Sequence, residues 1–580
     1  MSDNYEFMKA SESQDIDDYS PYVDKQYNNY INDINNGVYT NNSLTLVNFD
    51  LGQIYNSQKF ADTSDLFCVL PITMVAAFRK SSDNSLLAPA GGTCGLCSIK
   101  TNFVNLIHQA DLQINGKTIE STQPFINVAR HFQLLSEMSI NDLQSMGHSL
   151  GFAPTLDSVK SLQYVKTYAG AASSSGNGLC NNKPFGSADN QIAASGVQNT
   201  GVANSALQYK IGRYLDTTTA GSAVNGIVGN IVTKQQLVQE FRPYYDVLAT
   251  NYAVWYDFAV IKLSHLFESL GKMGLVRRFD ATLRLWVNTG TVNITVAGAG
   301  SANALQYSLT PENNTFSNTC PLMVNWLGAN NTAVPTDTTN IVAGLYIAKP
   351  PITSFNGVNL ANSNAAHPLM NCRLYFSQII VEPQKSIKYI EQNRNKKVVY
   401  RTFCSGMFPN IAAASTFNSL INSGIVHPTG VLIVPFIGTN TAAGNDRGFG
   451  DSQWKSPFDS CPSTTSMCSL TNLQVQIGGQ NVLQSNLFYN YENFLEQVNL
   501  AEQLTSSDFG VSTGLISQGY WEWSRWYFVN VERSNLADKL QPRNINVSFN
   551  NNSNVPIDVM IFIFYSDELV IDVETGIITK

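Results

Sequence analysis

Two stretches of this chain, LQINGKTIESTQPF at 112–125 and VQIGGQNVLQSNLF at 475–488, align without a gap. Four positions are identical between them, namely Gln113/Gln476, Ile114/Ile477, Gly116/Gly479 and Phe125/Phe488. Each stretch predicts a strand, a tight turn at the glycine, a short second strand and the start of a helix. Glycine suits the turn because the favoured hairpin turns need a positive φ, which a residue with a Cβ adopts only at a cost.

The similarity continues beyond the hairpin. Apolar residues recur at helical spacing after both turns, which predicts a helix in each copy; they are Phe125, Val128, Phe132 and Leu135 in one copy and Phe488, Tyr491, Leu495 and Val498 in the other. Strand-like runs then follow in the same order: AVIKL (259–263) and ATLRLWV (281–287) match RWYFVNV (525–531) and NINVSF (544–549), and both copies close on an apolar strand, RLYFSQIIV (373–381) or DVMIFIF (558–564).

A repeat in three parts and in one order indicates duplication of a whole domain. We therefore expect an all-β chain with one β domain at 43–385, a polar linker at 386–396 and a second β domain at 397–580. Many short strands separated by Asn, Gly, Pro and Ser favour a sandwich or a barrel. The first domain is longer because it holds two segments rich in small residues, near 168–206 and 289–315, which we expect to be loops.

The composition is poor in charge. Of 580 residues only 13% are charged, and the formal net charge is -8. When a contact buries a side chain, a neutral polar group loses less hydration free energy than a charged group does. A surface poor in charge therefore suits a protein that packs against copies of itself. A net negative chain does not favour direct nucleic-acid binding, which needs clustered Lys and Arg.

Residues 1–42 are expected to form a flexible acidic arm, either disordered or ordered on a neighbour. The first twenty residues hold six acidic side chains against the single Lys9. They lack the positive start and apolar core of a signal peptide, and no apolar run approaches the roughly 18 residues of a membrane span. The nine cysteines are accordingly read as reduced thiols.

No motif predicts catalysis, a cofactor or a metal. Cys94-Gly-Leu-Cys97 is a lone pair, and a zinc site needs four ligands at compatible spacing. The six histidines form no HExxH pair, and no nucleophile elbow or phosphate-binding glycine loop is present. The aromatic cluster that includes Trp523 and Trp526 suits a core or a subunit contact more than a sugar platform.

The order of elements resembles that of the double jelly-roll major capsid proteins of the polinton, virophage and adenovirus-like lineage of double-stranded DNA viruses. The resemblance lies in Cys372-Arg-Leu-Tyr375, in Glu382-Pro383 with Tyr389, in Lys397-Val-Val-Tyr400, and in the late aromatic strand with Trp523, Trp526, Tyr527, Val531 and Arg533. It implies two tandem eight-stranded jelly rolls, each with a short helix after a hairpin, and long loop insertions in the first roll.

The function implied is a structural one. Three copies would form a homotrimeric capsomer of pseudo-hexagonal outline that tiles an icosahedral virion, assembled inside the host cell. Its partners would be neighbouring capsomers and penton and minor capsid proteins, without sequence-specific contact to nucleic acid. The residues expected to matter are packing and turn residues, namely Gly116, Phe125, Gly479, Phe488, Trp523 and Trp526. The alternative is a secreted or surface carbohydrate-binding β-sandwich protein.

Overall fold

The computed structural model describes most of residues 23–579. The longer stretches outside the described part are 1–22, 81–95, 152–213, 217–233, 298–305, 326–337, 438–467, 501–513 and 533–541, and shorter breaks include 484–488 and 522–524. The expected loop at 168–206 therefore lies outside the described residues, as do the first 22 residues of the expected arm.

The second half of the chain forms two antiparallel layers, each built on four strands, and the short β27 (Ile578–Thr579) adds to one of them beside β26. One layer has the order β19-β26-β21-β24 and the other has the order β20-β25-β22-β23. In chain order the strands are β19 (Lys396–Ile411), β20 (Thr416–Ile425), β21 (Pro428–Ile437), β22 (Leu470–Ile477), β23 (Gln480–Asn481), β24 (Tyr527–Asn530), β25 (Arg543–Asn551) and β26 (Ile557–Ile571). Numbered along the chain, the layers read 1-8-3-6 and 2-7-4-5, which is the strand order of a jelly roll.

The first half repeats this order. One layer runs β1-β18-β3-β9 and the other runs β2-β11-β5-β6, again 1-8-3-6 and 2-7-4-5. The strands are β1 (Val23–Asn32), β2 (Leu44–Asp50), β3 (Phe60–Lys80), β5 (Ile107–Ile114), β6 (Lys117–Ser121), β9 (Tyr252–Lys262), β11 (Ala281–Asn288) and β18 (Arg373–Val381). The expected double jelly roll is confirmed.

Strand burial follows from the sequence pattern. In β11 the residues alternate between buried and half-buried, as expected for a strand with one face on the core. Residues 66–77 of β3, by contrast, are almost all buried, because apolar side chains cover both of its faces. The cores of both rolls join in one apolar cluster, so the two sandwiches share a continuous interior.

Residues 289–315 were expected to be a loop, and this is wrong for most of them. β12 (Gly290–Ala297), β13 (Gln306–Asn314) and β15 (Thr338–Ile347) add to the first sheet in the order β13-β12-β15-β3. The reason is the length of β3, which spans 21 residues. β18 pairs with β3 only between Phe60 and Val69, so β15 pairs with it beyond Ile72.

The arm expected at 1–42 is also wrong in part. β1 pairs with β18 along its length, so the first roll begins at Val23 instead of residue 43. The strand has no apolar pattern because it is an edge strand, and only Ile31 of its apolar residues is buried. Polar contacts help to hold it, as Asn29 Nδ2 donates to Gln378 Oε1 at 2.8 Å and Ser377 Oγ donates to Asn28 Oδ1 at 3.0 Å.

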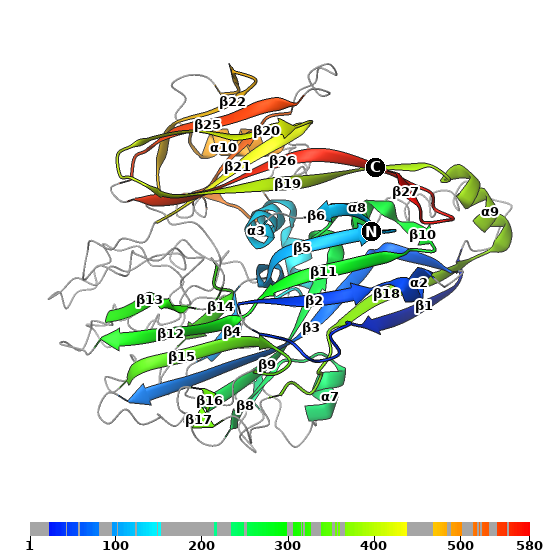
Figure 1. The fold of residues 1–580 in the computed structure, drawn as a ribbon, viewed down its shortest axis with the longest axis horizontal. Coiled ribbons are helices and arrows are strands. Elements are labelled where there is room, and N and C mark those ends of the chain that lie inside the picture. The colour runs from blue at the N-terminus through cyan, green and yellow to red at the C-terminus, as the bar shows by residue number, and fades with distance from the viewer. Residues whose placement is uncertain are drawn as a thin grey trace.

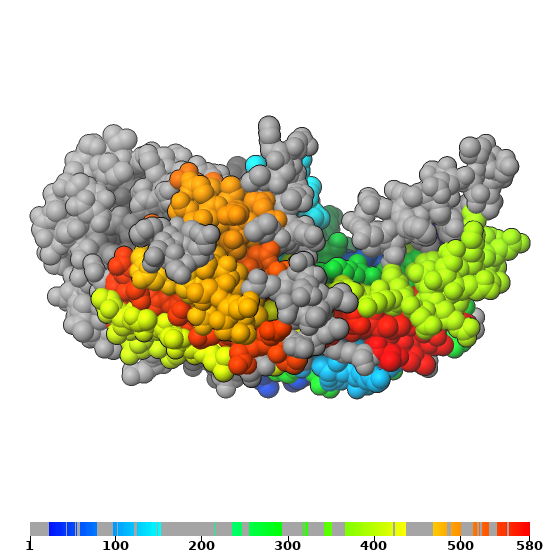
Figure 2. Space-filling model, turned by 90° about the horizontal axis from the view of Figure 1, so that it is seen from above, coloured from blue at the N-terminus to red at the C-terminus, as the bar shows by residue number. Residues whose placement is uncertain are grey.

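Both expected helices follow their hairpins. α3 (Ile126–Glu137) follows β6, and α10 (Tyr491–Leu500) follows β23. A third helix, α9 (Pro383–Gln392), joins the rolls; it begins three residues before the expected linker at 386–396 and has Pro383 in its first turn and Glu382 as N-cap. Figure 1 shows the second roll above the first, with α3 between them and α9 at the outer end. From above, residues near α9 project beyond the end of the second roll, beside the red atoms of the last residues (Figure 2).

The two hairpin glycines predict a matched pair of effects. Gly116 and Gly479 have φ of +74° and +83°, and an added Cβ would have no atom within 4 Å at either position. G116A and G479A should each lower the free energy of unfolding by about 1–2 kcal/mol, from backbone strain alone. Chemical denaturation of each variant measures this cost. G514A is the contrast, because Gly514 has φ of +62° but its Cβ would lie 2.2 Å from the Ser136 carbonyl oxygen. Equal losses in all three variants would contradict the account.

Candidate functional site

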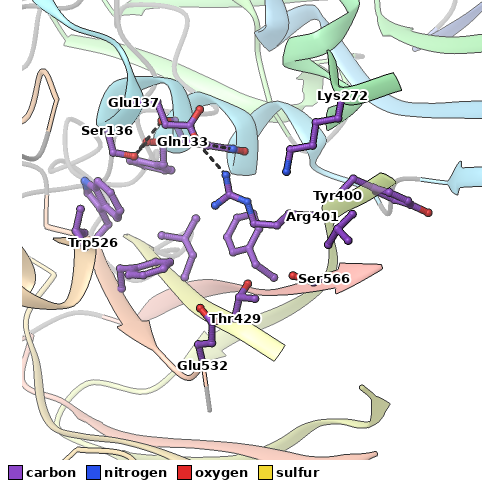
Figure 3. A pocket seen from close by; sticks show the side chains of 16 residues that line it. Gln133, Ser136, Glu137, Lys272, Tyr400, Arg401, Thr429, Trp526, Glu532 and Ser566 are labelled. Atoms are coloured by element: carbon purple, nitrogen blue, oxygen red, sulfur yellow. Dashed lines mark hydrogen bonds and ion pairs between the residues drawn. The ribbon is translucent and has the colours of Figure 1, made fainter. Parts of the chain in front are cut away.

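The contact between the two jelly rolls is the candidate site, because it sets the position of one roll relative to the other. From the first roll, α3 and α8 (Glu268–Met273) face it, and from the second, β19, β21, β24 and β26. Figure 3 shows side chains from both rolls converging on a shared cavity. We call this region the junction.

Arg401 of β19 is the centre of the polar contacts. Its backbone N–H donates to Glu268 Oε2 at 3.1 Å, and its Nε donates to the same oxygen at 3.3 Å. Its Nη2 donates to Glu137 Oε1 at 3.2 Å. One residue of the second roll therefore binds two carboxylates from two helices of the first, and its side chain is only 19% exposed.

Burial and the neighbouring charges shift the pKa values of the two carboxylates in opposite directions. Burial alone would raise the pKa of Glu268, but Arg401 and Lys272 outweigh it and hold that pKa below its usual value. Lys272 Nζ lies 2.6 Å from Glu268 Oε1. Burial raises the pKa of Glu137, although Arg401 and a hydrogen bond from Gln133 oppose the shift. Glu268 is thus the firmly ionised partner of Arg401.

Two further ionisable residues lie deeper, inside the first roll. Glu120 of β6 and Arg130 of α3 are buried, with exposures of 2% and 4%. Burial raises the pKa of Glu120 to about 8 against the opposing effect of Arg130, and burial lowers the pKa of Arg130. Arg130 Nη2 donates to the Leu266 carbonyl at 3.2 Å, and its guanidinium lies 5.9 Å from the ring centre of Phe403 in β19.

Aromatic side chains complete the same contact. Trp526 is buried, and its ring lies 4.9 Å from that of Phe132 in α3 and 4.7 Å from that of Phe494 in α10. Trp521 Nε1 donates to the Trp526 carbonyl at 2.7 Å, and this hydrogen bond holds the residue that directly precedes β24. Helices that follow equivalent hairpins in the two rolls therefore meet on one tryptophan.

The junction is not completely filled. A cavity of about 260 Å³ remains between the rolls. Its apolar wall includes Phe132, Trp526, Phe528 and Phe564, and its polar wall includes Arg401 and Glu137. The cavity is partly open to solvent, which leaves the ion pairs at its edge half-buried.

Further contacts join the rolls at the start of β19 and just beyond the end of β26. Lys396 Nζ donates to the Met273 carbonyl at 2.9 Å, and Arg277 N–H donates to the Val573 carbonyl at 2.8 Å. Asn115 Nδ2 donates to the Gly576 carbonyl at 2.5 Å. Gly576 has φ of +69°, and a Cβ there would lie 2.4 Å from the Arg278 carbonyl oxygen, so the segment after β26 packs directly on the first roll.

The residues expected from the sequence lie in different places. Gly116 and Gly479 occupy the two hairpin turns, and Phe125 is buried at the start of α3 with its ring 5.1 Å from His108. Trp526 alone lines the junction cavity. Phe488 and Trp523 lie outside the described residues. Whether any of these residues matters for assembly stays a prediction.

Sequence reasoning missed Arg401, Glu137 and Glu268. A signal was available for Arg401, because only 13% of the chain is charged and this residue follows the buried Tyr400 in an otherwise apolar part of β19. An arginine there must face away from the core of its own roll. Nothing in the local sequence of Glu137 or Glu268 indicates that the other roll provides their partner.

In the part of the chain that the structure describes, no group of three or more His, Cys, Asp or Glu side chains is placed to hold a metal ion. The six described cysteines are free thiols. None of the described helices has the length and apolar character needed to cross a membrane.

No family model matches the sequence, and no curated protein matches it. Several solved structures are similar in fold at low identity. A chain in a cryo-EM structure of the Sputnik virophage has a TM-score of 0.41 at 10% identity, over 97% of this chain and 89% of that one. The mavirus major capsid protein has 0.42 at 10% identity, over 95% and 89%, and the Faustovirus major capsid protein has 0.41 at 11%, over 95% and 91%.

Replacement of Arg401 should weaken the junction. R401M should lower the free energy of unfolding by about 3 kcal/mol, because it leaves Glu137 without its cation and Glu268 with Lys272 alone. Urea denaturation of the intact chain measures the loss. K397M is the matched control on the same strand, because Lys397 pairs with Glu568 where both side chains are more than half exposed, and this pair should contribute less than about 1 kcal/mol. Equal losses in the two variants would argue against a central role for Arg401.

Glu120 predicts a pH dependence with a definite sign. Its pKa in the folded chain is about 8, against 4.5 for the ordinary group, so the folded state binds the proton more tightly. Its contribution to stability is complete below pH 4.5 and is lost as the pH rises through 8. The stability of wild type relative to E120Q should therefore fall across this range, as measured by thermal unfolding at several pH values. A difference that is flat or rises with pH would contradict the assignment.

Proposed function

We propose that this chain is the major capsid protein of a double-stranded DNA virus or virus-like element. In this proposal three copies form a ring of six jelly rolls, and such rings tile the facets of an icosahedral shell. The observation that supports it most is the tandem repeat of one strand order, 1-8-3-6 and 2-7-4-5, in two rolls that share an interior.

The repeat matters because of symmetry. Closed oligomers of identical chains use rotational symmetry, and a three-fold ring of two-roll chains has six similar units around its axis. Such a ring has a nearly hexagonal outline and can be surrounded by six other rings, although its own contacts need only three-fold symmetry. This works only if the two rolls keep a fixed relation, and the Arg401 contacts and the Phe132–Trp526 contact support a fixed relation.

The outer layer of the second roll suits repeated contact between copies. Its outward side chains are neutral: Thr416, Asn418 and Leu420 on β20, Asn546, Ser548 and Asn550 on β25, and Gln474 and Gln476 on β22. Amides already pair across it, as Asn546 Nδ2 donates to Asn418 Oδ1 at 2.9 Å. The desolvation penalty of a neutral amide is smaller than that of a charged group. Weak contacts that are repeated over a whole shell together give high avidity.

The role is mechanical and not catalytic in this proposal. The partners would be the same chain in the trimer, neighbouring capsomers, and penton and minor capsid proteins. The place of action would be the virion, after assembly inside the host cell. Direct sequence-specific binding of nucleic acid is not part of the role.

Light scattering coupled to size-exclusion chromatography tests the oligomer. The purified chain should elute as a single species with three times the chain mass of 63.7 kDa. A glycan array on the same sample tests the alternative. A monomer of either kind would overturn the proposed trimer. A monomer that also binds glycans would favour a carbohydrate-binding sandwich over a capsid protein.

A further inference from the structure

We propose that the acidic segment 1–22 docks on the outer face of α9 in the same chain and thereby covers the link between the two jelly rolls. This goes beyond the proposed capsid role and does not depend on it. The occupant is a segment outside the described residues, and the site consists of described residues of α9 and the turn that follows it.

The first observation is the exposure of α9. Among its ten residues only Tyr389 is buried, and its ring packs edge-on against Phe60 at 5.9 Å while its hydroxyl donates to the Leu275 carbonyl at 3.2 Å. On the opposite side Ile387 is 60% exposed. Figures 1 and 2 show the helix at the outer end of the molecule, away from the main body of either roll.

The second observation is charge. Lys385, Lys388, Arg394, Lys396 and Lys397 lie on α9 and directly after it, against Glu382 and Glu391. Lys397 pairs with Glu568, and Lys396 donates to the Met273 carbonyl. Lys388 and Arg394 are exposed and make no ion pair with any other described residue. An exposed isoleucine beside two such cations suits a partner that carries both carboxylates and aromatic side chains.

The third observation is where the acidic segment leaves the fold. β1 is antiparallel to β18, and Val23 lies opposite Val381, two residues before α9 begins. Val23 also packs against the apolar cluster that contains Tyr389 and Phe60. Val23, the first described residue, therefore lies beside the start of α9.

The composition and length of the segment fit the site. It has six acidic residues and one lysine, and the part nearest the fold reads DIDDYSPY at 15–22. Eight extended residues span at most about 26–29 Å, and a ten-residue helix is about 15 Å long, so Asp15, Asp17 and Asp18 can reach the whole helix. Tyr19 and Tyr22 lie close enough in sequence to Val23 to cover Ile387.

Hydrogen exchange of the full-length protein, read by mass spectrometry, tests this contact. Amides in peptides from 1–22 and from 383–395 should exchange about tenfold faster in K388E/R394E than in wild type. K349E is the matched control, because Lys349 is an exposed lysine two residues beyond the end of β15, and it should change neither peptide. Raising the salt from 0.1 M to 1 M should speed exchange in wild type, since the screening length falls from about 10 Å to about 3 Å.

A charge swap separates docking from damage to the helix. Adding D15K/D17K/D18K to K388E/R394E should restore protection in both peptides, whereas D15K/D17K/D18K alone should lose it. Unchanged exchange of 1–22 in K388E/R394E would overturn the proposal, and so would failure of the swap to restore protection. Protection found only in assembled particles, and absent from the smallest species in solution, would assign the site to a neighbour's segment and overturn docking within one chain.

Discussion

The contact of Arg401 with Glu268 and Glu137 is the constraint on which the arrangement of the molecule depends. Each jelly roll has its own paired layers, and Arg401 is the centre of the charged contacts between the rolls, beside the apolar interior that they share. Arg401 binds Glu268 through its backbone and its guanidinium at 3.1 and 3.3 Å, and it reaches Glu137 from another helix at 3.2 Å. An arginine suits this position because its planar group can bond to two carboxylates at once. The contact between the tilted rings of Trp526 and Phe132 adds an apolar link between the rolls beside it.

Much of the fold could be predicted from the sequence, since the duplication is visible in the hairpins around Gly116 and Gly479. Turn geometry restricts the residue type there, so the two copies keep a common pattern. The strand β1 could not be found in this way, because an edge strand held by backbone pairing and by Asn and Ser contacts needs no apolar alternation. β12 and β15 were missed because their partner, the distal half of β3, is remote in the sequence.

The junction was harder to predict than the fold. Trp526 could be expected as a packing residue from its size, and it does line the cavity between the rolls. The carboxylates of Glu137 and Glu268 have ordinary helical surroundings in the sequence, and their importance comes from a strand more than a hundred residues away. Pairings of this kind depend on the packing of two complete domains, which local patterns do not contain. The scarcity of charge in the chain is the one general signal that points to such residues.

Two similar jelly rolls share one interior in each chain, and in the proposed trimer three chains would present six similar units. A cryo-EM reconstruction of the purified protein, computed without imposed symmetry, tests this most directly. We predict a ring with three-fold symmetry and six β-sandwich lobes, in which the two lobes of each chain meet at α3 and β19. A particle in which the lobes of one chain take variable relative orientations, or in which the halves differ in strand order, would contradict the account.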